Sequence, residues 1–199
     1  MIIEALIEGT HTTVPTKDGW QLPGHTGAVT LVRAQHHNIL IDTGARGQFE
    51  AIRRALAATE LSPKDITDII LTHLHLDHAY NVAFFPKAHL FAWQHEWRAG
   101  ETIGYRDISH YHLVKGLSFL PTPGHAAEHL SVVLQHANFT TVIAGDAINE
   151  DFVRTDQISA FTYDEDLYRQ SAASIIAVAD LIVPGHGQPF RPKEIQRTA

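Results

Sequence analysis

Short runs in which apolar and polar residues alternate recur along this chain, and a period of two predicts strands with one buried face. The continuous apolar run Ile69-Ile70-Leu71 predicts a buried strand. Strands are expected near residues 2–8, 28–33, 38–42, 69–71, 88–92, 117–121, 129–135, 140–145 and 180–183, with a turn at residues 36–38.

Two segments follow the helical period of 3.6 instead. In residues 48–59, Phe49, Ile52 and Leu56 form an apolar stripe opposite Arg53, which predicts an amphipathic helix. A second helix is expected at 164–179, with its apolar part packed on a sheet. Strand-rich halves with helices between them predict an α+β fold in which two sheets are covered by outer helices. No linker, repeat or low-complexity stretch divides residues 1–199, so one domain is expected.

The densest candidate chemistry follows the 69–71 strand, where His73, His75, Asp77 and His78 stand within six residues. Side chains two apart on an extended chain point the same way, so His73 and His75 can hold one ion. The turn that follows can direct Asp77 and His78 toward a second ion. Imidazole and carboxylate are the ligands that divalent transition metals take from proteins. The alternative is a histidine-rich surface loop, but this order of residues is rare by chance even in a chain with 15 His.

Three later strands each end at a glycine and deliver one further metal-binding residue. His125 ends Thr-Pro-Gly-His, Asp146 ends Ala-Gly-Asp, and His186 stands in Pro-Gly-His-Gly. Glycine lets the backbone turn sharply and approach a metal closely. One such histidine would more often be structural, but three strand ends of the same form predict a convergent dinuclear site.

In this order, the motifs His-x-His-x-Asp-His, Thr-Pro-Gly-His, Gly-Asp and Pro-Gly-His-Gly resemble those of the metallo-β-lactamase superfamily. Asp42-Thr43-Gly44 is similar to the family's early Asp-Thr-Gly, so the resemblance spans nearly the whole chain. Within the superfamily, the segment from Val178 to Phe190 most resembles the subfamily of metallo-β-lactamase domain-containing protein 1 and its microbial relatives.

The resemblance implies an αββα metallo-β-lactamase sandwich, two β-sheets flanked by helices, with the site at one edge where strands end. It implies that one metal is held by His73, His75 and His125. It implies that the other is held by Asp77, His78 and His186, and that Asp146 bridges the two.

A dinuclear site predicts a metal-dependent hydrolase that attacks an ester, thioester, lactone or phosphodiester with a metal-bridging hydroxide. Two divalent ions about 3.5–4 Å apart can lower the pKa of a bound water from about 15.7 toward about 7. Asp77 is expected to be catalytic, as an acceptor for the nucleophile's hydrogen bond; the alternative is pure ligation. The expected cofactors are two divalent ions, zinc first, with manganese and iron also accepted by a site of nitrogen and oxygen ligands.

Two other activities share this fold and stay open. Superfamily persulfide dioxygenases keep much the same ligands but use a single iron, and the narrower resemblance implies an RNA endonuclease. The net charge of −7, with 15 basic and 22 acidic residues, offers no basic footprint for nucleic acid. A small-molecule substrate is therefore the expected partner, nucleic acid is not supported by charge, and the oligomeric state is open, a homodimer included.

The chain has no cysteine, which excludes disulfides and thiolate ligands. Its start, with Glu4 and Glu8 and no basic residue, predicts a strand and not a signal peptide. No apolar run reaches membrane-spanning length, so no membrane partner and a cytoplasmic location are expected.

Several residues near the motifs have two interpretations. Asp42 either orients a ligand imidazole or caps a turn, and His129 is expected to support the site or be structural. A polar stretch from Gly9 to Gly27 carries His11, Trp20 and His25, and forms either a flap over the site or packing at the sandwich rim. Candidates for the leaving-group acid are Glu150, Tyr80, Tyr105 and His112. Acyl-homoserine lactonases have a Tyr where this chain has Asn149, which argues against that activity.

Overall fold

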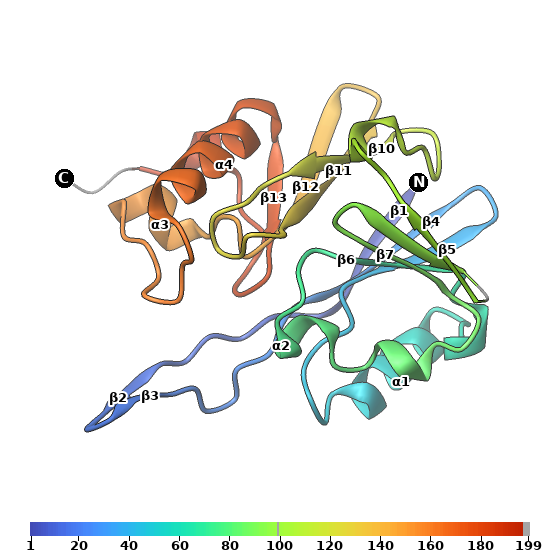
Figure 1. The fold of residues 1–199 in the computed structure, drawn as a ribbon, viewed down its shortest axis with the longest axis horizontal. Helices are drawn as coiled ribbons and strands as arrows, with labels where there is room; N and C mark the ends of the chain where they lie inside the picture. Colours follow the sequence, from blue (N-terminus) through green and yellow to red (C-terminus); the bar gives the residue numbers. More distant parts are fainter. Residues whose placement is uncertain (99, 197–199) are drawn as a thin grey trace.

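Most of the strands form two sheets that pack against each other. The protein is described by a computed structural model over residues 1–98 and 100–196. Within that part of the chain, the larger sheet has seven strands and the smaller has four (Figure 1). The larger sheet runs in the order β1 (Ile2–Ile7), β4 (Val29–Ala34), β5 (His37–Ile41), β6 (Asp68–Leu71), β7 (His89–Ala92), β8 (His95–Arg98) and β9 (Glu101–Gly104). The smaller runs β10 (Leu117–Pro121), β11 (Leu130–His136), β12 (Phe139–Gly145) and β13 (Leu181–Pro184).

Alternate residues of each strand enter different hydrophobic layers, as the period of two predicts. In β5, Ile39 and Ile41 face the core between the sheets, whereas Leu40 faces a layer that also holds α1 (Phe49–Ala58). In β12, Ile143 enters the inner core and Val142 packs beneath α4 (Glu165–Val178). Helices thus cover the outer face of each sheet (Figure 1), and the expected αββα sandwich is confirmed.

The predicted long elements are present within one or two residues, but the predicted turn at 36–38 is wrong. The turn consists of Gln35 and His36, and His37 begins β5 with its Nδ1 2.6 Å from the buried Asp68 Oδ2. The elements not predicted are short. They are β2 (Val14–Thr16), β3 (Gly19–Gln21), β8, β9, α2 (Leu76–Ala79), α3 (Glu150–Thr155) and single 3₁₀ turns at Pro63–Asp65, Val82–Phe84, Ile108–His110 and Pro192–Glu194.

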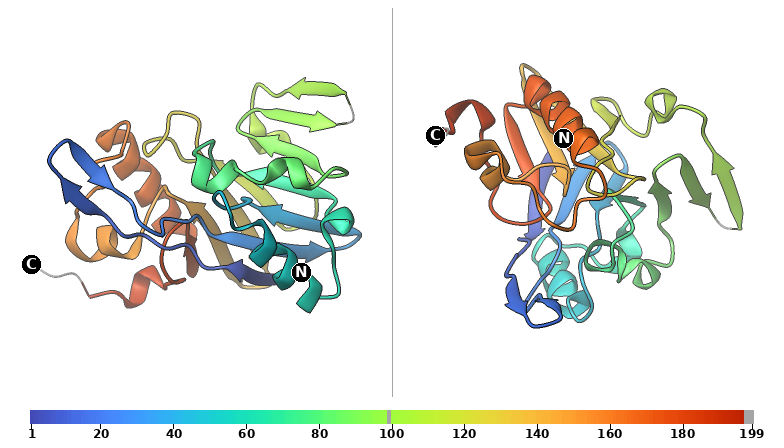
Figure 2. Two further views of the ribbon diagram at one scale, coloured as in Figure 1. Left: turned by 90° about the horizontal axis from the view of Figure 1, so that it is seen from below. Right: turned by 60° about the vertical axis from the view of Figure 1, so that its left-hand side comes forward.

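Residues 9–27, the N-terminal arm, leave the sandwich as an exposed hairpin. Its outer part is the β2–β3 pair, and its base closes where Thr10 and Thr26 exchange backbone hydrogen bonds of 2.8 and 3.0 Å. Figure 2 (left) shows the hairpin, in dark blue, extending beyond the ends of the sheets. The polar stretch noted in the sequence is therefore a separate flap and not part of either sheet.

The strands that precede the metal-binding motifs end at one edge of the sandwich. β6 runs parallel to β5 and β7, and β12 runs parallel to β13. β10 and β12 are both antiparallel to β11, so these two strands also end on the same side. At this edge Leu130 N–H donates to Thr72 O across the two sheets at 2.9 Å. None of the helices in the described ranges is long and apolar enough to cross a membrane.

Candidate metal centre

The first group of donor atoms comes from the loop after β6 and the loop after β10. The ligand atoms of His73, His75 and His125 lie within 4.8 Å of one another. The closest pair is His125 Nε2 and His75 Nδ1, at 2.9 Å. The structure therefore brings together the three histidines expected to hold the first metal.

The second group is built on α2 and the loop after β13. His78 Nε2 and His186 Nε2 lie 3.4 and 3.3 Å from Asp77 Oδ2, and 3.4 Å from each other. These are the three residues expected to hold the second metal.

Asp146, directly after β12, lies between the two groups. Its Oδ2 is 3.3 Å from His125 Nε2 in the first group and 3.3 Å from His186 Nε2 in the second. Its Oδ1 is 3.3 Å from His78 Nε2. A Cβ on Gly185 would lie 2.0 Å from this Oδ1, so only glycine lets the β13 loop approach so closely. This carboxylate stands where a bridging ligand must stand.

Three donor atoms in the cluster are buried without a well-formed hydrogen bond: His73 Nε2, Asp77 Oδ2 and Asp146 Oδ1. Buried polar atoms are normally satisfied, and atoms left unsatisfied in a converging cluster call for an ion or water among them. Each of the three belongs to the donor set described above. The residues present therefore fit bound cations.

The protonation states of His73, His125 and Asp146 suit metal ligands. Burial lowers the pKa of the His73 imidazole well below its usual range and that of His125 to about 4, so both rings are neutral at neutral pH. Although burial would raise the pKa of Asp146, the neighbouring His78 and His186 outweigh it and hold that pKa well below the ordinary value. Burial would lower the pKa of His186, but Asp146 and Asp77 raise it to about 9. The ionised carboxylates thus favour positive charge at this site. Bound divalent cations would supply that charge while the imidazoles stay neutral.

Asp42 orients His78 from below the site. Its Oδ2 accepts a hydrogen bond from His78 Nδ1 at 2.8 Å, which leaves Nε2 facing the donor cluster. The backbone N–H and the hydroxyl of Thr72 each donate to the same carboxylate at 2.8 Å. Asp42 therefore supports a candidate ligand imidazole and also fixes the backbone before His73.

His129 lies fully buried beneath Asp146. Its Nε2 accepts from the Asp146 N–H at 3.2 Å, so its Nδ1 carries the proton and donates to Thr122 Oγ1 at 2.9 Å. Thr122 Oγ1 is in turn 2.9 Å from Ser131 Oγ. Because both ring nitrogens face these partners, the geometry gives His129 a supporting position, as expected.

A cleft of about 740 Å³ opens over the donor cluster. Its lining includes Trp20 and Leu22 of the N-terminal arm, and Ile158 and Phe161 of the segment after α3. Trp20 is 52% exposed and lines this cleft, which fits a flap and not packing at the rim.

Of the four candidates for the leaving-group acid, only Glu150 lines the cleft. Tyr105 donates instead to Glu96, 2.6 Å away. Asn149 caps α3, its Oδ1 accepting from Phe152 N–H at 2.7 Å. Tyr168 of α4, which the sequence did not single out, also lines the cleft; burial, and then Asp146, raise its pKa, so its hydroxyl stays protonated.

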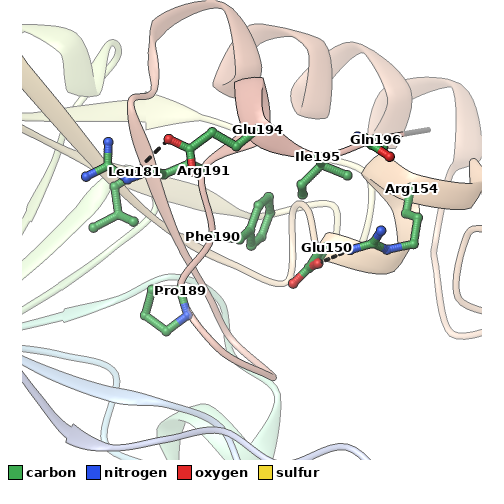
Figure 3. A pocket seen from close by; sticks show the side chains of 9 residues that line it. All are labelled: Glu150, Arg154, Leu181, Pro189, Phe190, Arg191, Glu194, Ile195 and Gln196. Carbon is green, nitrogen blue, oxygen red and sulfur yellow. Dashed lines mark hydrogen bonds and ion pairs between the residues drawn. The ribbon is translucent and has the colours of Figure 1, made fainter.

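A separate cavity of about 540 Å³ lies between α3 and the segment after β13 (Figure 3). None of the residues described in its lining is a histidine, and its two carboxylates, Glu150 and Glu194, pair with Arg154 and Arg191. This cavity lacks the donors of the cleft, so the cleft is the candidate functional site.

Comparisons with known proteins agree with this geometry. A family model described as the metallo-beta-lactamase superfamily matches residues 22–111. Metallo-beta-lactamase domain-containing protein 1 of Xenopus laevis is 30% identical over 193 residues, which cover 95% of this chain and 81% of the relative. The chain belongs to the metallo-β-lactamase superfamily. The motifs of the sequence predicted this membership.

Two further comparisons define the extent of the similarity. The Mus musculus protein of the same name is 34% identical over 81% of this chain, and the chain spans 64% of that relative's length. The solved structure of AidC, described as a dizinc quorum-quenching lactonase in complex with a product, has a TM-score of 0.61 and 20% identity over 85% of this chain and 74% of that chain. This chain of the metallo-β-lactamase superfamily therefore shares the αββα fold with AidC.

Sequence reasoning did not expect one residue of the cluster, His25 in the arm. Its Nε2 lies 3.1 Å from Asp77 Oδ2, and its ring stacks on that of His186 with centroids 4.3 Å apart. No sequence motif surrounds His25. Its contact with Asp77 depends on how the arm is placed relative to the strand ends, which the local sequence does not indicate.

Proposed function

We propose that this protein is a dinuclear metallohydrolase that acts on small, uncharged acyl substrates: esters, thioesters or lactones. The observation that carries the proposal is the position of Asp146 between two groups of donor atoms, 3.3 Å from a histidine of each. In this proposal, His73, His75 and His125 hold one ion, Asp77, His78 and His186 hold the other, and Asp146 contacts both. Zinc is the expected metal, because the donors are imidazole nitrogens and carboxylate oxygens. AidC, which is described as a dizinc enzyme of this fold, supports the same choice.

When bound, two divalent ions would acidify a water molecule and polarise the substrate oxygen that gains charge. Asp77 lines the cleft, and its pKa is held below the ordinary range: burial opposes ionisation, but His186 and His25 outweigh it. Its ionised oxygen can accept a hydrogen bond from the attacking water, and we assign it the catalytic role. Tyr168 and Glu150 are the groups in the cleft that could protonate the leaving oxygen or sulfur.

The walls of the cleft favour an uncharged acyl substrate over a phosphodiester. No Lys or Arg is among the described residues that line it, whereas Glu150 and Asp151 stand at the wall beside the donor cluster. Glu150 pairs with Arg154, which is not among the lining residues, so the described wall of the cleft offers a phosphodiester no Lys or Arg to receive it. The apolar Trp20, Leu22 and Phe161 offer a surface for an acyl chain.

The RNA endonuclease alternative has the fold in its favour and the charge against it. The net charge is −7, and nucleic-acid binding requires several cationic contacts to phosphates. The mono-iron persulfide dioxygenase alternative needs only part of the donor set. It gives no reason for Asp146 to contact histidines of both groups.

The test is a panel of acetyl and longer-chain esters, thioesters and lactones, with bis-p-nitrophenyl phosphate and a structured RNA as comparators. We expect kcat/KM to be higher for the uncharged acyl substrates, with activity lost to a chelator and restored by zinc or manganese. An Asp146→Ala preparation, purified in the same way, controls for contaminating hydrolases. Steeply salt-dependent RNA cleavage would favour the endonuclease, and oxygen consumption with a persulfide would contradict the hydrolytic reaction.

A further inference from the structure

Three imidazole nitrogens surround one oxygen of Asp77. His25 Nε2, His186 Nε2 and His78 Nε2 lie 3.1, 3.3 and 3.4 Å from Asp77 Oδ2. The ligand atoms of His25, Asp77 and His186 lie within 4.8 Å of one another, and the His25 side chain is only 19% exposed. The His25 ring stacks on that of His186, and because its Nδ1 is buried without a hydrogen-bond partner, its polar contact within the described residues is the one between Nε2 and Asp77. A cation at this point could be coordinated by the three Nε2 atoms and by Asp77 Oδ2.

The base of the arm also positions His186. His186 Nδ1 lies 3.0 Å from Thr26 O and 3.2 Å from Thr10 O, the carbonyls at the two ends of the arm. A donor bond from Nδ1 to a carbonyl fixes the ring so that Nε2 is free to bind a metal. The arm is therefore connected to the second donor group through its backbone at Thr10 and Thr26 and through the side chain of His25.

We propose that His25 is an additional ligand of the ion held by Asp77, His78 and His186, and that this ion fastens the N-terminal arm over the cleft. The proposal rests on the dinuclear site proposed above. It makes the wall that carries Trp20 and Leu22 dependent on occupancy of the second site.

The base of the arm is also held by its backbone: Gly187 N–H donates to Gly9 O at 2.9 Å and Gly27 N–H donates to Asp77 O at 3.1 Å. Beyond this base, little in the described part of the chain holds the arm in place. Its residues from His11 to Gly24 are exposed, apart from the half-buried Thr13, and its strands pair only with each other. A segment with so few buried contacts opens at low free-energy cost. An ion bound by His25 ties the arm to α2 and to the loop after β13.

Thermodynamic linkage makes two effects equal in size: the gain in affinity for the second ion when the arm closes, and the shift toward the closed arm when the ion binds. If closing the arm adds one ligand and raises the affinity of the second ion by a factor, then the ion favours the closed arm by the same factor. Loss of a group that supports a metal site typically costs about 10–100-fold in affinity, so we expect at least about 10-fold for a ligand. Binding of the second ion should lower the equilibrium constant for opening of the arm by the same factor.

The first experiment is a competitive zinc titration of the full chain against a chelating dye. In the wild type we expect two equivalents, and in His25→Ala the second equivalent should bind at least about 10-fold more weakly while the first is unchanged. His25→Gln should lose as much, because an amide can still donate to Asp77 but is a poor ligand for zinc. His11→Ala is the matched control: His11 lies in the same arm with its ring 5.8 Å from that of His186, and it is expected to leave both affinities unchanged.

The second measurement is tryptic cleavage after Lys17, the first Lys or Arg of the chain, at the tip of the arm. Zinc should slow this cleavage about 10-fold in the wild type and in His11→Ala, and much less in His25→Ala. Matching thermal unfolding of the metal-free variants shows that each is folded. Wild-type affinity for the second equivalent in His25→Ala would overturn the proposal, as would His25→Gln binding like the wild type. A wild type that takes up only one equivalent would instead refute the dinuclear site on which the proposal rests.

Discussion

Replacing Asp42 by asparagine should weaken the second metal while leaving the fold almost intact. Asp42 accepts from His78 Nδ1 and from the backbone N–H of Thr72, each at 2.8 Å. In the asparagine variant the amide oxygen can still accept from Thr72, but the amide nitrogen then faces the His78 Nδ1–H, donor against donor. His78 must either lose that hydrogen bond or change tautomer, and the second tautomer places a proton on the Nε2 that would bind the metal.

The expected loss is about 10–100-fold in affinity for the second ion, or about 1.4–2.7 kcal/mol. Asparagine is a better test than alanine for two reasons. Asp42 adopts a positive φ of 59°, which asparagine tolerates. Alanine would also leave the buried Thr72 N–H without a partner, which costs about 1–3 kcal/mol of folding stability by itself.

The assay is a zinc titration with thermal unfolding of the metal-free protein, and Asp68→Asn is the matched control. Asp68 is also a buried carboxylate that accepts from a histidine, His37 Nδ1 at 2.6 Å, but it stands at the opposite end of β6 from the metal-binding motif. We expect Asp68→Asn to bind two ions with wild-type affinity. If Asp42→Asn did the same, the argument that Asp42 orients a metal ligand would be refuted.

Three further predictions follow from the same contacts. Asp146→Ala should loosen both ions together and abolish turnover, and equal behaviour of the Asp146 and Asp42 variants in titrations would contradict their different positions. The hydrolytic rate should rise with pH through a single ionisation near neutrality, that of the acidified water; a bell-shaped or flat profile would argue against it. Burial lowers the pKa of His129 from 6.5 to about 3, so the unfolded chain binds more protons between these values. Stability of the metal-free protein should therefore fall as pH drops from about 6.5 toward about 3, and His129→Gln should remove part of this slope in urea unfolding.

Much of this fold could be predicted from the sequence because its long elements have a clear period. Ile39, Leu40 and Ile41 alternate between two buried layers, and Gly124, Gly145 and Gly185 mark where three of the strands stop. The seven candidate ligands could be found because each stands within a few residues of such an end. One missed helix, α3, had a local signal: Asn149 caps it, and Glu150 and Asp151 occupy its first turn.

The remaining features depend on contacts between distant segments. His25 has no periodic or motif context, and its approach to Asp77 depends on how the whole arm folds back. His37 was expected in a surface turn, but the buried carboxylate of Asp68 on the neighbouring strand draws it into β5. Tyr168 reaches the cleft from α4, whose sequence pattern indicates only which side packs on the sheet. Pairings of this kind cannot be inferred from spacing along the chain.

The count of metal ions per chain tests the central claim most directly. The protein should be loaded with zinc, freed of excess metal, and measured by elemental analysis against protein concentration. The geometry of Asp146 between two groups of histidines predicts two equivalents. A ratio that never exceeds one, with iron as the metal retained on purification, would contradict the dinuclear hydrolase and favour a mono-iron enzyme of the same fold.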